Sequence, residues 1–189
     1  MSGQGYHLAL DREQTDQLLS FDDGSDLLDW VSELFEGAWT GKDKTPIEGG
    51  HKDWNVLLGC LTNGTYDPKG GAYPLNLCFF GGRLLVQGGS IVNLVMPDDV
   101  GHVAEALAKI DKHDFRERYT RVPSDDLFHR ETGAKDDEYQ YELYAQMCKL
   151  KTFYQRAAQE GRAVIFYTDD PLDMFFKGED LREHRTEIG

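Results

Sequence analysis

The sequence predicts an α+β domain in which a small, mainly antiparallel sheet is flanked by several helices, one of them long and C-terminal. Three observations lead to this prediction: strand-like segments occur near both ends, a glycine-rich β region lies in the middle, and amphipathic helical segments separate them. Strands and helices do not alternate regularly, which disfavours a doubly wound nucleotide-binding fold. The 189 residues suffice for one core, so we expect a single domain over residues 1–168 and an acidic extension over residues 169–189.

A strand and two helices are predicted at the start of the chain. Residues 6–10 form a short apolar segment typical of a strand. Asp11 and Gln14 then make a capping-box pattern, which indicates the start of a helix. Ser25 is a favourable N-cap residue for a second, amphipathic helix. The apolar positions of that helix recur at helical spacing and are Leu27, Leu28, Val31, Leu34 and Phe35.

The next segment alternates between loop and helix patterns. Residues 36–50 have the composition of a loop, with four glycines and one proline. The helix predicted after them carries Trp54 on its apolar face and ends near Asn63. Residues 66–71 have turn chemistry, because proline fixes φ and glycine admits positive φ. Residues 74–80 fit either a strand or a helix, and so short an apolar segment leaves both open.

The middle of the chain is predicted to hold short strands followed by helices. Glycine pairs bracket residues 83–87, and the apolar segment 91–95 follows, which favours one or two strands joined by tight turns. Pro97 suits the first position of a helix, and Asp111 can cap a shorter helix after it. The polar segment 120–135 contains a proline and a glycine and is predicted to be an exposed loop.

A long helix and a strand are predicted towards the C-terminus. From Asp136 an apolar series continues for about six turns up to Gly161, a residue that suits a helix end. Residues 163–167 are β-branched and aromatic, as in a strand. The tail from Asp169 has seven acids and three bases and only a brief apolar patch, so we expect it to dock loosely or to fray.

The chain is strongly acidic, since 34 Asp and Glu against 20 Lys and Arg give a formal charge of -14. Such a surface repels phosphate backbones and anionic lipids, so direct binding to nucleic acids or membranes is not expected. It favours solubility first, and then a basic protein partner. An odd number of cysteines without C-x-x-C spacing predicts reduced core thiols at Cys60, Cys78 and Cys148. With no signal segment and no apolar stretch of about 20 residues, we expect a cytoplasmic protein.

No catalytic motif and no cofactor site are predicted. The sequence has no G-x-S-x-G, H-E-x-x-H, P-loop or G-x-G-x-x-G pattern. Asp98, Asp99, His102 and Glu105 lie within two helical turns, a spacing at which carboxylates and an imidazole could share a metal. Acids in a first helical turn are ordinary complements of the helix dipole, however, so we interpret this group as structural and predict neither a metal nor a cofactor.

Several short motifs follow one another in a characteristic order. They are Gly5-Tyr6 in the first strand, a tryptophan helix ending in Leu61-Thr62, then Asp67-Pro68, Pro74-Leu75, Gly81-Gly82 and the helix led by Pro97. This order resembles the YfbM-like family, domain of unknown function 1877, over residues 3–168. The resemblance implies an architecture but no activity. In that family the tryptophan is often followed by aspartate and, three residues later, by histidine, whereas Asn55 and Leu58 stand at those positions here.

An acidic segment that leads into two tyrosines is the candidate partner-binding site. Carboxylates accept paired hydrogen bonds from arginine, and tyrosine offers a rigid apolar ring with a polar tip. The residues predicted to bind a basic protein are Asp125, Asp126, Asp136, Asp137, Glu138 and Tyr141. The alternative interpretation is that Tyr139 lies in the core, that Tyr141 is incidental, and that the acids only favour the start of the helix.

These observations lead to two main hypotheses about function. The first is a non-catalytic cytoplasmic protein-binding module whose acidic face engages a basic partner, for example an immunity protein that neutralises a toxin. The toxin role rests on analogy with other small acidic bacterial proteins. The second is a small-molecule-binding protein or a hydrolytic enzyme, with a pocket near the helix of Trp54, Tyr66 and the glycine-rich β region. A structural or stress-related protein without a stable partner is a third interpretation.

Overall fold

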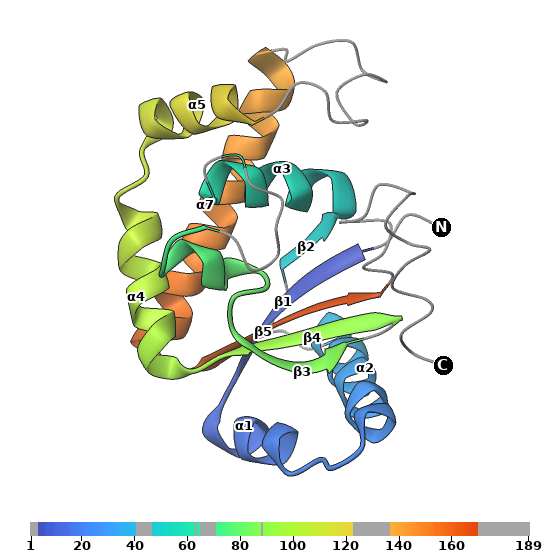
Figure 1. Ribbon diagram of the computed structural model, residues 1–189. Helices are drawn as coiled ribbons and strands as arrows, with labels where there is room; N and C mark the ends of the chain where they lie inside the picture. Colours follow the sequence, from blue (N-terminus) through green and yellow to red (C-terminus); the bar gives the residue numbers. More distant parts are fainter. Residues whose placement is uncertain are drawn as a thin grey trace.

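The structure is a computed structural model that describes residues 4–40, 47–62, 64, 71–87, 89–122 and 137–169 (Figure 1). Its elements are β1 (Gln4–Leu10), α1 (Arg12–Leu19), α2 (Gly24–Thr40), β2 (Ile47–Gly50), α3 (His51–Leu61), the 3-10 helix η1 (Leu75–Cys78), β3 (Arg83–Gln87), β4 (Ser90–Val95), α4 (Pro97–Ala108), α5 (Lys112–Arg121), α7 (Asp137–Gln159) and β5 (Ala163–Asp169). The predictions for residues 66–70, 123–136 and 170–189 lie outside the described residues. The predicted α+β class is confirmed.

The sheet has five strands in the order β2-β1-β5-β4-β3, and every neighbouring pair is antiparallel. β5 lies in the centre because it pairs with β1 on one side and with β4 on the other. Phe166 of β5 lies opposite His7 of β1 and also opposite Asn93 of β4. Because directly opposed residues project to the same side, these three side chains share one face of the sheet.

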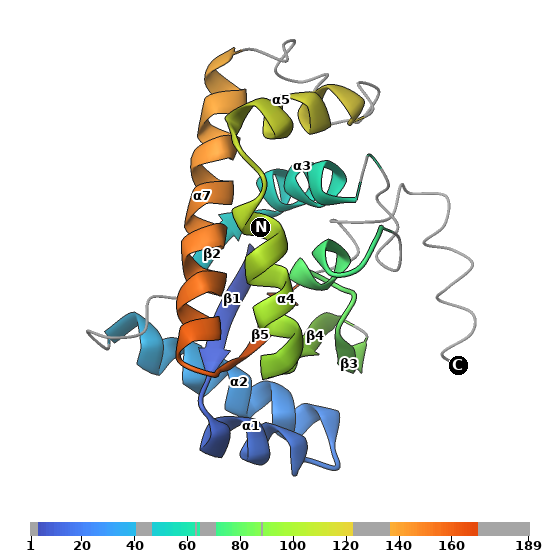
Figure 2. The ribbon, with the colours of Figure 1, turned by 90° about the vertical axis from the view of Figure 1, so that its left-hand side faces the viewer.

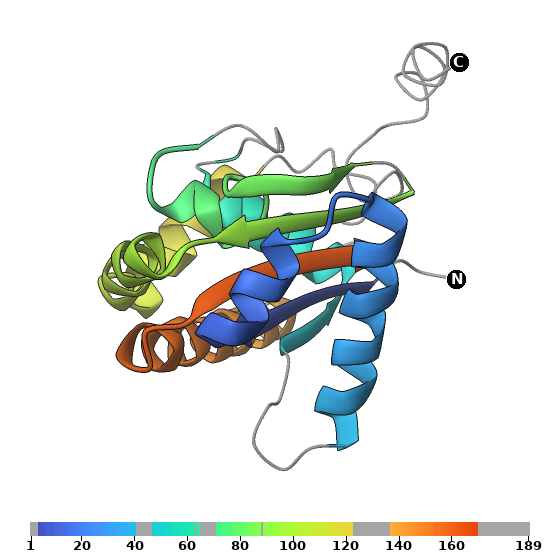
Figure 3. The same ribbon diagram turned by 90° about the horizontal axis from the view of Figure 1, so that it is seen from below.

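Alternate side chains of the strands enter two separate cores, one on each face of the sheet. Leu8 and Leu10 of β1 pack in the core formed with α1 and α2. Val164 and Phe166 of β5 pack in the other core, which α3, α4 and α7 cover, while α5 packs against α3 and α7. Figures 2 and 3 show α1 and α2 on the opposite side of the sheet from these helices.

An aspartate caps each of the first two helices. The Asp11 carboxylate accepts a hydrogen bond from the Gln14 amide at 2.9 Å, and the Gln14 side chain accepts one from the Asp11 amide at 3.0 Å, so the predicted capping box is confirmed. The prediction that Ser25 caps α2 is wrong. That helix begins at Gly24, and the Asp23 carboxylate accepts from the Ser25 amide at 2.6 Å. Aspartate caps as well as serine does, and the sequence offers both.

The loop predicted over residues 36–50 is shorter than its composition indicates. α2 continues to Thr40, and residues 47–50 form β2, which pairs with β1 at one edge of the sheet. Two of the four residues of β2 are glycines, which have a low strand propensity. Pairing with β1 overrides that local preference, and a sequence pattern does not reveal such pairing.

Residues 74–80, for which strand and helix were both open, form the short helix η1 and the turn that follows it. The preceding Tyr73–Pro74 peptide bond is cis. A β-carbon on Gly81 would lie 2.6 Å from the carbonyl oxygen of Asn76, so the close approach at the end of η1 requires glycine. β3 and β4 then form an antiparallel pair at the places that the glycine pairs predict.

The helices predicted in the second half of the chain are confirmed. α4 begins at Pro97, Asp111 caps α5 through a capping box, and α7 is followed by Gly161 at a φ of 63°. The predicted loop after α5 starts later than its composition indicates, since the helix continues to Arg121. In the described part of the chain, no helix combines the length and the apolar character needed to span a bilayer.

Candidate functional site

The densest group of carboxylates in the described residues lies on α1, α2 and the turn between them. We call this surface the acidic face. Arg12 is the one basic residue between residues 11 and 36, and its side chain is 96% exposed with its Nε 3.9 Å from Asp16. The exposed carboxylates that define the acidic face are Glu13, Asp16, Asp22, Asp23, Asp26, Asp29, Glu33 and Glu36.

Four of these acids recur along α2 at spacings of three and four residues, and Asp22 precedes them just before the helix. The four are Asp26, Asp29, Glu33 and Glu36, and they lie on one side of the helix, while Leu27, Val31 and Phe35 are buried on the other. Like charges at these spacings are neighbours on a helix and destabilise it by about 0.2–0.5 kcal/mol per pair. The last turn of α2 has no basic residue that would offset them. The stripe therefore lowers the stability of the helix that carries it.

The helix dipole explains only the first part of the stripe. Asp23 and Asp26 lie at the positive N-terminal end of α2, where carboxylates are favourable. Glu33 and Glu36 lie in the second half of the helix, one to two turns before its end, where the dipole does not favour a carboxylate. The spacing was visible in the sequence, but the prediction assigned partner binding to a different acidic segment.

The described part of the predicted partner-binding segment lies at the other end of the molecule, where α7 begins (Figures 1 and 2). Asp125, Asp126 and Asp136 are outside the described residues, and Asp137 is the first residue of α7. Glu138 is exposed, and Tyr141 is 63% exposed with its ring 5.6 Å from the Lys112 ammonium group. The structure therefore brings Glu138 and Tyr141 together on an exposed helix start.

Tyr139 behaves differently from its neighbours on α7. It is half-buried and packs against the core, as the alternative interpretation predicts. Its hydroxyl donates a hydrogen bond to Asp53 of α3 at 3.3 Å. Burial, together with the nearby Asp53 carboxylate, raises the pKa of Tyr139. This tyrosine links α7 to α3 and is not available to a partner.

Two members of the group considered as a metal site, Asp99 and His102, contact a tyrosine instead. The Tyr73 hydroxyl donates to Asp99 at 2.8 Å and is also hydrogen-bonded to Nδ1 of His102. Since the hydroxyl proton goes to Asp99, Nδ1 of His102 is the donor to the tyrosine oxygen. The hydrogen bond to Asp99 raises the pKa of Tyr73. Among the described residues, no group of three or more His, Cys, Asp and Glu is placed to hold a metal ion.

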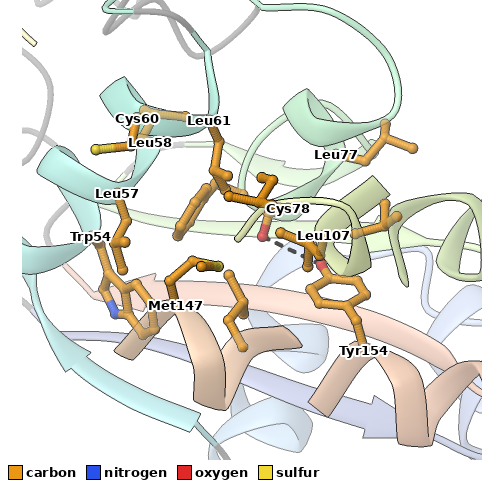
Figure 4. Packing of buried hydrophobic residues seen from close by; sticks show 14 of the residues in the cluster. Trp54, Leu57, Leu58, Cys60, Leu61, Leu77, Cys78, Leu107, Met147 and Tyr154 are labelled. Atoms are coloured by element: carbon orange, nitrogen blue, oxygen red, sulfur yellow. Dashed lines mark hydrogen bonds between the residues drawn. The ribbon is translucent and has the colours of Figure 1, made fainter. Parts of the chain in front are cut away.

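A groove of about 420 Å³ lies between the C-terminal half of α4, one side of α5 and η1. Its charged residues are three bases and two acids, which is unusual on so acidic a chain. The prediction placed a pocket near the helix of Trp54, Tyr66 and the glycine-rich β region. Trp54 is buried in the core (Figure 4), and Tyr66 lies outside the described residues. The residues that line the groove are Leu75, Ala106, Lys109, Ile110, Asp114, Glu117, Arg118 and Arg121.

His7 is a buried histidine that the sequence analysis did not identify. Its Nε2 donates to the carbonyl oxygen of Cys78 at 2.6 Å, and the Tyr154 hydroxyl donates to the same oxygen at 3.4 Å (Figure 4). Nδ1 of His7 has no hydrogen-bond partner among the described residues. Burial lowers the pKa of His7 to about 4, so the ring is neutral near pH 7. The five rings around it belong to Trp54, Phe79, Phe153, Tyr154 and Phe166.

The groups around His7 are arranged for packing. Cys78 is fully buried, and burial raises the pKa of its thiol. Burial also raises the pKa of Tyr154 well above its usual value. All three ionisable groups are therefore uncharged near neutral pH and are out of contact with solvent. Strand alternation in the sequence is enough to place His7 on the same face of β1 as Ala9. It does not identify the residues that contact His7, because they come from distant segments.

Comparison with known proteins follows the fold. The family model described as "Domain of unknown function (DUF1877)" matches residues 1–167. The crystal structure of YfbM from Escherichia coli, a protein of unknown function, has 18% sequence identity and a TM-score of 0.58, and the match covers 87% of this chain and 99% of that chain. At this identity the likeness shows the fold alone. No curated protein matches the chain. The resemblance that the short motifs predict is confirmed.

Proposed function

The chain belongs to the DUF1877 family, a domain of unknown function, and on this premise we propose that it is a non-catalytic protein-binding module. The acidic face engages a partner that has a basic surface. The observation that supports this proposal is the stripe of exposed carboxylates at the start of α2 and along it, whose like charges repel one another. Such a cost in stability is tolerated where function requires the residues that cause it.

Electrostatics supports a basic protein as the partner. Complementary charge speeds the encounter of two proteins and selects against partners of the wrong sign. The acidic face carries eight exposed carboxylates and one arginine, so an arginine-rich or lysine-rich surface is the complement. By analogy with other small acidic proteins, we propose neutralisation of a basic toxin as the biological role. A cytoplasmic site of action is part of the proposal, and Cys60, Cys78 and Cys148 form no disulfide in the described residues.

The test compares two variants that lose the same amount of charge. The tagged chain is cross-linked in cells of its source organism, the partner is identified by mass spectrometry, and the purified pair is titrated. Asp29→Asn with Glu33→Gln neutralises the acidic face, whereas Asp98→Asn with Glu105→Gln neutralises two exposed or half-exposed acids of α4. We expect the first pair to weaken binding about tenfold at low salt and the second pair to leave it nearly unchanged.

The toxin role has its own readout. Expression of the partner alone should arrest growth, and co-expression of this chain should restore it, whereas the acidic-face variant should restore it less. Equal binding by both double variants would overturn the proposal for the acidic face. If Glu138→Gln and Tyr141→Ala weaken binding instead, the partner binds the predicted surface at the start of α7.

Small-molecule binding is a second candidate function, and the groove beside α5 is the observation that favours it. The groove and the acidic face lie on opposite sides of the sheet. An experiment can therefore exclude one of the two candidate functions without excluding the other. Hydrolysis, the other part of the predicted alternative, stays a prediction.

A further inference from the structure

We propose that the groove between α4, α5 and η1 binds a small organic carboxylate that has an apolar body. Three features of the groove support this ligand class: uncommitted cations, acids that are already engaged, and an apolar floor. This site goes beyond the proposed partner binding and uses none of the residues of the acidic face.

The cations of the groove keep most of their hydrogen-bonding capacity. Nη1 of Arg118 donates to the carbonyl oxygen of Cys60 at 3.3 Å, which holds the half-buried guanidinium in place and leaves its other N–H groups for a ligand. Lys109, just after α4, has no acidic partner within the described part of the chain. A guanidinium that is fixed in advance loses little entropy when it binds a carboxylate through two hydrogen bonds.

The acids of the groove are engaged with other groups. Glu117 lies 3.9 Å from Arg121 and 4.0 Å from His113 on the same helix. The Asp114 side chain accepts from the Asp111 amide at 3.5 Å in the capping box of α5. Arg121 and Glu117 offset each other, and the Asp114 carboxylate lies at the positive end of the α5 dipole. With three bases against two acids, the lining keeps one net positive charge, and Lys109 and Arg118 are the cations that an anion would meet.

The apolar part of the lining, which we call the floor, selects against a bare inorganic anion. Half-buried Leu75 and Ala106 supply most of this apolar surface, since Ile110 is only 3% exposed. Apolar surface of this kind is better covered by a hydrocarbon body than by water. A volume of about 420 Å³ lies in the usual range for small-molecule sites. A lining that combines cations with apolar side chains suits an amphipathic carboxylate.

The negative net charge of the chain makes the positive charge in the groove a stronger indication of anion binding. A surface with a charge of -14 repels anions at long range, so non-specific accumulation of a carboxylate is disfavoured. Binding of an anion here would have to depend on close contacts with Lys109 and Arg118. Affinity should therefore be sensitive to single substitutions at these positions.

The experiment is an amide chemical-shift titration of the full chain with 4-phenylbutyrate and, in parallel, with its uncharged amide. For a ligand of this size we expect a Kd on the order of 1 mM for the acid. Saturable shifts should appear at Ala106, Ile110 and Arg118. Lys109→Gln and Arg118→Gln should each weaken binding about fivefold to tenfold. Arg12→Gln removes one exposed positive charge on the other side of the sheet and should leave the Kd unchanged.

Lys109→Gln should not affect folding, because this side chain is exposed and makes no ion pair in the described residues. Weaker binding by this variant would therefore report on the groove itself. Absence of saturable shifts up to about 10 mM acid would overturn the proposal. Equal affinity for the amide would overturn the role of the cations. Equal or tighter binding of inorganic phosphate would overturn the role of the apolar floor.

Discussion

The indole Nε1 of Trp54 donates a hydrogen bond to the carbonyl oxygen of Gly5 at 2.8 Å and so ties α3 to β1 across 49 positions of the chain. The two residues also touch directly. A β-carbon on Gly5 would lie 2.7 Å from Cδ1 of Trp54 and 3.0 Å from Cζ of Phe166. Glycine at position 5 therefore lets the Cδ1–Nε1 edge of the tryptophan ring approach the first strand closely.

Gly5→Ala should destabilise the fold by about 1–3 kcal/mol, because the added methyl group overpacks the contact with Trp54. Urea denaturation followed by circular dichroism measures the change in the free energy of unfolding. Gly101→Ala is the matched control, since a β-carbon there meets nothing within 4 Å inside α4. That control should stabilise the fold by about 0.5–1 kcal/mol through helix propensity. A Gly5 variant as stable as the parent would contradict the packing argument.

His7 should make stability depend on pH between its unfolded and folded pKa values. The unfolded ring binds a proton near pH 6.5, whereas the folded ring does so only near pH 4. As pH falls through this window, the unfolded state gains protons first, so the free energy of unfolding decreases. The loss at pH 4 should approach about 3 kcal/mol relative to pH 7.

His7→Gln isolates this contribution, because glutamine can still donate to the Cys78 carbonyl oxygen but does not titrate. Chemical denaturation at pH 7, 6, 5 and 4 gives both stability profiles. The profile of the variant should be flatter than that of the parent by about the amount stated. Parallel profiles would mean that another group causes the acid sensitivity.

Glu33→Lys should stabilise α2. The lysine would replace one of several like charges on the helix and would lie four residues after Asp29 and three before Glu36. We expect a gain of about 0.5–1 kcal/mol at low ionic strength that shrinks in salt. Glu13→Lys, the same change in the first turn of α1, should have the opposite sign. Thermal unfolding at two salt concentrations measures both, and a loss of stability at Glu33 would show that the stripe has a structural role.

Native thiol reactivity should differ among the cysteines. Cys78 and Cys60 are fully buried, and the pKa of the Cys78 thiol is raised, so both should react only when the protein unfolds. Cys148 is half-buried on α7 and should be modified first. Labelling with a disulfide reagent, followed by peptide mass spectrometry, assigns the order. Cys148→Ser should remove the early phase, and early modification of Cys78 would show that the core around His7 opens readily.

The features that could be predicted well from the sequence are those formed by residues close to one another in the chain. The capping box of Asp11 and Gln14 and the proline at the start of α4 involve residues only a few positions apart. The spacing of the acids on α2 is also a local pattern and is visible in the printed sequence. The prediction nevertheless assigned partner binding to the acids near Tyr141. Local patterns thus fixed the helices but did not rank the acidic surfaces.

Features that depend on tertiary pairing were not predictable in this way. β2 forms because β1 offers it a partner, although its composition is that of a loop. The surroundings of His7 come from η1, α3, α7 and β5, and the groove needs α5 to lie beside α4. A single sequence does not state which segments meet, so these sites became visible only in three dimensions.

The central position of β5 also has a consequence for synthesis. On a ribosome, β1 and β4 emerge long before residues 163–169, and neither can pair with the strand that joins them until those residues are released. The nascent chain must therefore carry β1 and the β3-β4 hairpin unjoined until β5 has been made. Closure of the sheet then becomes a single long-range event that depends on the synthesis of β5.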